Sequence, residues 1–166
     1  IDVIIRALGR LNAALDATLT IVGDGDQRKN LEKLTRELGL ADRVVFTGRV
    51  TDEQLRAYLT GASVFVIASV AELQSIATME AMASGLPILA ADAMALPHLV
   101  HHGENGYLFQ PGNDRELADR ITQVLTASRD DYLEMQRQSL EAVKIHDLDR
   151  TLNTFEALYR GETPPK

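Results

Sequence analysis

The stretch ASVFVIASVAELQSIATMEAMASGLPILAA, residues 62–91, carries the pattern that decides the fold. Its apolar, β-branched segment 63–68 predicts a buried strand. The Ala- and Met-rich segment 75–84 is followed by Gly85, which is typical of a helix with a glycine after its last turn. The apolar run ILAA then follows Pro87. A strand, a helix and a second strand in this order predict two parallel strands joined by a crossover helix.

The same alternation extends in both directions from this stretch. Upstream, we expect helices at 2–15 and 26–38, strands at 17–23 and 43–48, and a helix opened by the capping box of Thr51 and Gln54. Downstream, we expect a short helix near 95–100, a strand at 107–109, a helix capped by Asn113 and Glu116, and two helices within 130–160. Roughly four or five strands separated by helices indicate an α/β fold, with a parallel sheet flanked by helices. Ligands of such sheets bind at the carboxyl ends of the strands.

Composition limits the kinds of protein that this chain can be. Its 166 residues contain 17 Lys and Arg against 24 Asp and Glu, a formal net charge of −7, and no cysteine. The absence of cysteine excludes disulfides, thiolate metal sites and cysteine nucleophiles. An acidic chain without a dense basic run argues against a nucleic-acid partner. The longest apolar stretch, at 62–71, is far shorter than the roughly 20 residues that span a bilayer. We therefore expect one soluble, cytoplasmic domain.

Two carboxylates flank the start of the helix near Ser75. Glu72 lies in the preceding loop and Glu80 in the second helical turn. The first-turn amides have no acceptor within the helix and can bind phosphate oxygens, helped by about 0.3–1 kcal/mol of dipole attraction. These are the amides of Gln74, Ser75, Ile76 and Ala77. A neighbouring carboxylate can accept hydrogen bonds from hydroxyls, so the combination suits a sugar nucleotide. From spacing alone, an acidic helix start and a solvated Glu are the simpler interpretation.

Several motifs occur together in an order that resembles one enzyme family. They are the pair Glu72-x(7)-Glu80, which continues into EAMASGLP, and the segments IVGDG (21–25), VVFTGRV (44–50) and NGYLF (105–109). Their order and spacing resemble the donor-binding half of the retaining GT-B glycosyltransferases, from Ile1 to about Leu125. The resemblance implies a Rossmann-like domain, the C-terminal half of a GT-B fold. It also implies an enzyme that moves a hexose from a nucleotide sugar to an acceptor hydroxyl with retention.

The resemblance implies a role for each matching residue around the helix start. Glu80 would hold the ribose hydroxyls of the nucleotide. Glu72 would contact the hydroxyls of the transferred sugar, as the carboxylate of the catalytic site. The diphosphate and the sugar would also meet Gln74, Ser75 and Ile76. The donor would be a UDP-, GDP- or ADP-hexose, and neither a metal nor another cofactor is expected.

A second group of matching residues would surround the base. The resemblance implies that backbone groups around Gly48, Arg49 and Val50 contact it, and that Gly23 and Gly25 let the neighbouring loop approach. Ordinary turns and helix ends also use glycine, so these residues have a structural interpretation as well.

The resemblance divides the chain into three parts. Residues 1–128 would form the nucleotide-sugar-binding domain without its first strand, 129–160 the helices that return toward an N-terminal acceptor domain, and 161–166 a disordered tail. Helical spacing already begins at Ile1, so we expect a fragment that lacks the first strand, the acceptor domain, and an Arg and a Lys that neutralise the diphosphate. The strands at 19–22 and 63–67 should then face a gap.

The acceptor is less defined by the sequence. The order Glu-Leu-Gln at 72–74 is closer to the glycolipid-forming members, which suggests a lipid acceptor and a peripheral membrane association of the parent enzyme; a cell-wall glycan is also open. The alternative function is a non-catalytic domain that keeps the fold to bind a nucleotide or a partner. The presence of both Glu72 and Glu80 favours the enzyme.

Other candidate groups have simpler interpretations. Two of the histidines His98, His101 and His102 could bind a metal, but no ligand pattern is completed and loop histidines are the default. The basic residues of 26–38 form a solvated helix face or, alternatively, a surface for a partner or an anionic lipid: Arg28, Lys29, Lys33 and Arg36. The resemblance implies that an apolar stripe on the last helix meets the absent domain, so this chain alone should expose some of its side chains; packing on its own domain is the alternative: Leu148, Leu152, Phe155 and Tyr159.

Overall fold

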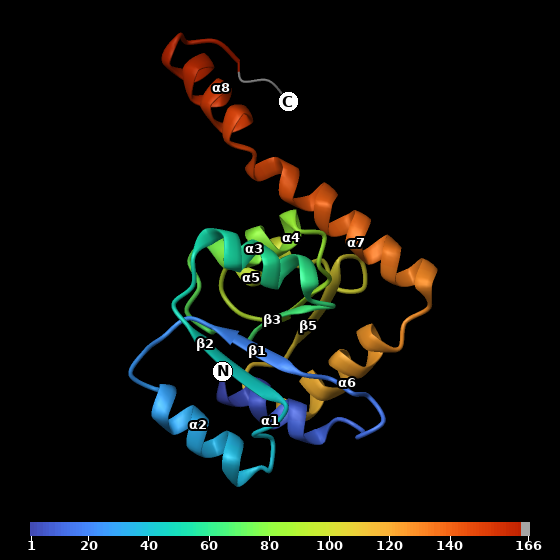
Figure 1. The fold of residues 1–166 in the computed structure, drawn as a ribbon. Coiled ribbons are helices and arrows are strands. Elements are labelled where there is room, and N and C mark those ends of the chain that lie inside the picture. Colours follow the sequence, from blue (N-terminus) through green and yellow to red (C-terminus); the bar gives the residue numbers. More distant parts are fainter. Residues whose placement is uncertain (164–166) are drawn as a thin grey trace.

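The computed structural model describes residues 1–163 and confirms the alternation of helices and strands (Figure 1). In chain order the elements are α1 (Asp2–Arg10), β1 (Leu19–Val22), α2 (Arg28–Glu37), β2 (Val44–Gly48), α3 (Asp52–Gly61), β3 (Phe65–Ile67), α4 (Ile76–Ala83), β4 (Ile88–Ala91), α5 (Leu96–Leu99), β5 (Gly106–Phe109), α6 (Asp114–Leu125), α7 (Arg129–Val143), the 3-10 turn η1 (Lys144–His146) and α8 (Leu148–Tyr159).

Both predicted helix caps are confirmed. Thr51 Oγ1 accepts from the N–H of Gln54 at 3.2 Å, and Gln54 Oε1 accepts from the N–H of Thr51 at 2.9 Å. Asn113 Oδ1 accepts from the N–H of Glu116 at 3.1 Å. The first helix is shorter than the expected 2–15, because the backbone becomes extended at Leu11 and the side chain of Asn12 then accepts from a nearby amide.

The strands form two parallel sheets instead of one. β1 pairs with β2, and β3 pairs with β4, which pairs with β5. As expected, β1 and β3 are not hydrogen-bonded to each other, and no backbone hydrogen bond joins the two sheets within residues 1–163. The α/β architecture is therefore confirmed, but the sheet is divided between its second and third strands.

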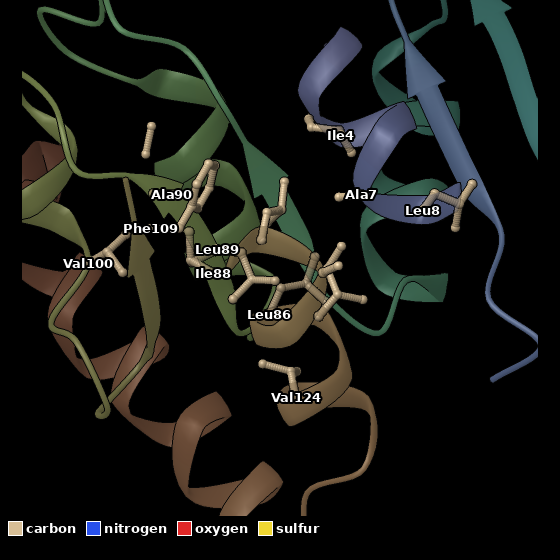
Figure 2. Packing of buried hydrophobic residues seen from close by; sticks show 14 of the residues in the cluster. Ile4, Ala7, Leu8, Leu86, Ile88, Leu89, Ala90, Val100, Phe109 and Val124 are labelled. Carbon is tan, nitrogen blue, oxygen red and sulfur yellow. The ribbon is translucent and has the colours of Figure 1, made fainter. Parts of the chain in front are cut away.

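The core lies around the three-stranded sheet (Figure 2). All four residues of β4 are fully buried, as expected for a parallel strand covered on both faces. Phe109 of β5, Ile5 of α1 and Val124 of α6 pack around it. Gly106 permits the close pairing of β5 with β4, because a Cβ at this position would lie 1.8 Å from the backbone oxygen of Ile88.

The two C-terminal helices behave differently from each other. α7 packs on α4, and the buried Ser139 donates to the backbone oxygen of Leu86 at 2.7 Å. α8 projects away from both sheets (Figure 1). The expected exposure of its apolar stripe is confirmed, since all four residues are 51–89% exposed: Leu148, Leu152, Phe155 and Tyr159.

The end of α8 also differs from the expected tail at 161–166. Gly161 adopts φ +72 and its N–H donates to Leu158, while the N–H of Glu162 reaches back to Ala157 at 2.9 Å. This is the Schellman arrangement that closes many helices. Residues 161–162 therefore belong to the helix end, and the last three residues of the expected tail lie outside the described part of the chain.

Candidate nucleotide-sugar site

Most of the predicted site residues lie after the ends of strands or at the start of a helix, and they are divided between the two sheets. Glu72, Gln74 and Ser75 follow β3, and Gly48, Arg49 and Val50 lie at the end of β2 or follow it. Loops and helix N-termini of parallel sheets meet at this edge, which is where α/β proteins bind ligands. The structure thus places one group of candidates on each sheet.

The start of α4 offers fewer free amides than the sequence predicts. The N–H of Ile76 donates to the backbone oxygen of Gln74 at 3.2 Å, so its predicted direct contact with phosphate is not supported by a free donor. The N–H groups of Gln74, Ser75 and Ala77 donate to no acceptor within residues 1–163. These three remain available for an anion at the helix N-terminus.

Ser75 begins α4 but does not cap it with its side chain. Its hydroxyl lies 2.8 Å from Thr78 Oγ1, and both residues are buried. Two small hydroxyls that satisfy each other fix the first turn against the core. Ser75 can therefore contribute its backbone amide to a ligand, but its hydroxyl is turned to Thr78.

The two carboxylates have no charged partner among the described residues. Glu72 is half-buried and Glu80 is exposed, and the side chain of neither makes a hydrogen bond or an ion pair within residues 1–163. The backbone oxygen of Glu72 accepts from the N–H of Ala95 at 3.2 Å, which ties this loop to the loop after β4. There Met94 adopts φ +52, a conformation that side chains seldom take. This second loop starts after Ala91, at the carboxyl end of β4, which is one of the strand ends where the sequence predicts ligand binding.

On the other sheet, two predicted glycines meet directly. The N–H of Gly23 donates to the backbone oxygen of Gly48 at 2.9 Å, and both have positive φ, +119 and +69. A bulge at Ile21 and Val22 precedes this contact. Positive φ is the reason that glycine is required at both positions. Gly25 is exposed in the same loop, and its N–H donates to Asp24 Oδ1 at 2.9 Å.

The structure does not join the two groups of candidates. No hydrogen bond or ion pair among residues 1–163 links Gly23, Gly48 or Arg49 to Glu72 or Glu80. A ligand that contacts both groups would therefore have to bridge two sheets.

Two of the histidines make local contacts. His101 lies 3.6 Å from Glu104, and His102 Nδ1 accepts from the N–H of Leu108 at 3.1 Å while its ring packs edge-on against Tyr107. Within residues 1–163, no three His, Asp or Glu side chains are grouped so that they could hold a metal ion. In the same part of the chain, none of the helices combines the length and the apolar character needed to span a bilayer.

Comparison with known protein families shows which family the chain belongs to. The family model of glycosyl transferases group 1 matches residues 1–142. The chain belongs to this glycosyltransferase family. A glycosyltransferase of Methanocaldococcus jannaschii is 36% identical over 126 residues, which cover 76% of this chain and 32% of that protein. The MMP α-(1→4)-mannosyltransferase of Mycolicibacterium hassiacum is 37% identical over 128 residues, which cover 76% of this chain and 31% of that protein.

The solved structures agree with this assignment of the glycosyltransferase domain. HepE of Anabaena, solved with UDP, superposes with a TM-score of 0.84 at 27% identity, over 96% of this chain and 44% of that one. The fold is that of the C-terminal domains of GT-B glycosyltransferases. The chain spans about a third of the length of the curated relatives that it matches.

Proposed function

We propose that this domain binds the nucleotide-sugar donor of a retaining hexosyltransferase. The observation that carries the proposal is the start of α4, where backbone amides lie between two carboxylates and, among residues 1–163, the amides have no acceptor and the carboxylates no cation. Backbone amides can donate hydrogen bonds to a diphosphate, and free carboxylates can accept them from hydroxyl groups. The site therefore suits a ligand that carries both a diphosphate and hydroxyl groups, as a sugar nucleotide does. The titles of the HepE structures, solved with UDP and with UDP-glucose, support a donor of this class.

In the proposed complex each group acts on one part of the donor. Glu80 accepts hydrogen bonds from the ribose hydroxyls, and Glu72 accepts them from the hexose. The amides of Gln74, Ser75 and Ala77 hold the diphosphate. As the bond between the anomeric carbon and the diphosphate breaks, these amides and the positive end of α4 stabilise the charge that moves onto the leaving group. The mechanism proposed here uses no metal and no other cofactor.

We propose that the transfer reaction also needs parts of the enzyme that the described residues do not include. We propose that an additional parallel strand fills the space between β1 and β3, and that an acceptor domain meets the exposed stripe of α8. The segment 68–80, which surrounds the phosphate amides, contains no Lys or Arg. We therefore expect this chain to bind its donor with millimolar or weaker affinity, about −4 kcal/mol, and to transfer no sugar by itself. A glycolipid or a cell-wall glycan is the proposed acceptor.

The test compares nucleotide binding by variants of the two carboxylates. Glu80→Ala should weaken binding of the nucleoside diphosphate about 10- to 100-fold, because hydrogen bonds to a charged acceptor contribute about 1.5–3 kcal/mol. Glu72→Ala should weaken binding of the sugar nucleotide and leave the nucleoside diphosphate within about twofold. Glu37→Ala is the matched control, since Glu37 is exposed at the end of α2 and pairs with Lys33. Unchanged affinity in a folded Glu80→Ala variant would refute the proposed ribose contact.

A further inference from the structure

Arg28, in the first turn of α2, is held against β2 by several contacts at once. Its Nε donates to Glu32 Oε1 at 2.8 Å, and its Nη2 donates to the backbone oxygen of Phe46 at 3.2 Å. The guanidinium also lies over the Phe46 ring, 5.9 Å from the centroid. The side chain is 34% exposed. The sequence suggested a solvated basic face for α2, but at Arg28 the structure shows a packed and hydrogen-bonded side chain.

The same guanidinium occupies the space beside the glycine at the end of β2. A Cβ added to Gly48 would lie 3.2 Å from Arg28 Nη1, which is tighter than an ordinary contact. The backbone oxygen of Gly48 also accepts from Gly23 in the loop after β1. Gly48 is therefore bound by Gly23, in the loop after β1, and the side chain of Arg28 from α2 fills the space beside it.

The turn that follows Gly48 presents free backbone donors. The N–H groups of Arg49 and Val50 donate to no acceptor within residues 1–163, whereas the N–H of Thr51 is bound by Gln54. The direction of a free amide depends on how firmly the preceding residue is fixed. For Arg49 the preceding residue is Gly48, which is bound by Gly23 and flanked by the side chain of Arg28.

We propose that Arg28 is a positioning residue for the nucleobase of the donor. By binding the Phe46 carbonyl and filling the space beside Gly48, it directs the amides of Arg49 and Val50, which are the groups that bind the base. This inference rests on the proposed function. Arg28 does not serve as a phosphate ligand, because Glu32 at 2.8 Å and Asp24 at 4.0 Å already offset its charge. It therefore raises the affinity for the base and leaves the affinity for a base-free diphosphate unchanged.

The positioning role of Arg28 requires the geometry of its guanidinium group, and a positive charge alone is not sufficient. An arginine presents several donors in one rigid plane, so it can bind Glu32 and the Phe46 carbonyl while its face lies on the ring. A lysine has one compact ammonium group and cannot make these contacts together. Arg28→Lys should therefore restore the effect of the arginine only in part.

The experiment is an amide NMR titration with UDP, GDP and ADP, and with inorganic pyrophosphate as the base-free probe. The proteins are the wild type, Arg28→Ala, Arg28→Lys and the matched control Arg36→Ala, whose side chain is exposed in the last turn of α2. Arg28→Ala should bind the preferred nucleoside diphosphate about tenfold more weakly and pyrophosphate within about twofold of the wild type. Arg28→Lys should be intermediate, and Arg36→Ala should match the wild type. Unchanged nucleotide affinity in Arg28→Ala, or equal losses for nucleotide and pyrophosphate, would overturn the inference.

A measurement without ligand separates this inference from the proposed function. The amide order parameters of Arg49 and Val50 should fall in Arg28→Ala from about 0.85, the rigid value, toward 0.6 or below. Unchanged order parameters would overturn the positioning role. If the wild type bound none of the nucleotides while the order parameters fell as expected, the proposed function would be refuted and the hold of Arg28 on the turn would stand.

Discussion

The two sheets of this domain differ in how completely they are buried. Every residue of β4, the middle strand of the larger sheet, is fully buried. In the smaller sheet Val22 of β1 and Val45 of β2 are 38% and 54% exposed, and only alternate residues of β1 face the interior. The larger sheet therefore supplies the core, and the smaller one depends on a single covered face. The difference shows that the two halves of the candidate site rest on supports of unequal stability.

The division of the site follows the division of the sheets. The carboxylates and the free amides at α4 belong to the well-buried sheet, where Ser75 and Thr78 fix the helix start. The glycine contact and the free amides of Arg49 and Val50 belong to the less buried sheet. A donor that binds both groups would connect the two sheets, so ligand binding and the stability of the smaller sheet should be coupled.

The largest effect should come from the contact between β4 and β5. Gly106→Ala places a Cβ 1.8 Å from the backbone oxygen of Ile88, so we expect a loss of more than about 4 kcal/mol in the free energy of unfolding, or failure to fold. The control is Gly103→Ala, where φ is +87 and no atom lies within 4 Å of the new Cβ, and the expected loss is about 1–2 kcal/mol. Urea denaturation measures both. Similar losses in the two variants would show that the close approach at Gly106 is not what limits the sheet.

A smaller difference should separate matched deletions in the two sheets. Leu89→Ala in β4 removes a fully buried side chain and should cost about 2–5 kcal/mol. Val45→Ala in β2 shortens a half-exposed side chain and should cost less than about 1 kcal/mol. The same denaturation experiment checks this pair. A cost for Val45→Ala close to that of Leu89→Ala would mean that the smaller sheet is covered in solution.

Hydrogen exchange should separate the sheets without mutation. Amides paired between β4 and β5 should exchange only on global unfolding, while those paired between β1 and β2 should exchange at least about tenfold faster by local opening. Equal protection factors for the two ladders would contradict the unequal support that we infer from burial.

The smallest effect should come from α8. Because its apolar stripe is exposed and the helix projects from the domain, truncation after Asp147 should change the free energy of unfolding by less than about 0.5 kcal/mol. Thermal and urea unfolding of the two lengths of chain provide the measurement. A large loss of stability would show that α8 folds back onto the domain in solution.

Local signals predicted most of the elements. Caps such as Thr51 with Gln54 act through neighbours in sequence, and the apolar runs of β2 and β4 mark strands directly. The end of α1 was missed because the side chain of Asn12 competes with the helix, which helical spacing alone does not reveal. Periodicity grouped Leu152 with its stripe on one face and left two alternatives for what covers that face, and the structure shows the face exposed.

The candidate site was predicted by motif, but its details depend on contacts between distant segments. Glu72 and Glu80 could be selected from their spacing around a helix start. The loss of the Ile76 amide to Gln74 and the contact of Ala95 with Glu72 depend on backbone geometry that sequence does not specify. The packing of Arg28 on Gly48 was missed for the same reason, because a basic residue on a polar helix normally indicates a solvated face.

We infer that the two sheets bind one nucleotide sugar together. The decisive measurement is amide NMR of the chain, titrated with UDP-, GDP- and ADP-hexoses. For one of these donors the amides of Arg49 and Val50 on the smaller sheet and those of Gln74 and Ala77 on the larger sheet should shift along a single binding curve. Shifts confined to one sheet, two curves with different affinities, or no shift with any donor would contradict it.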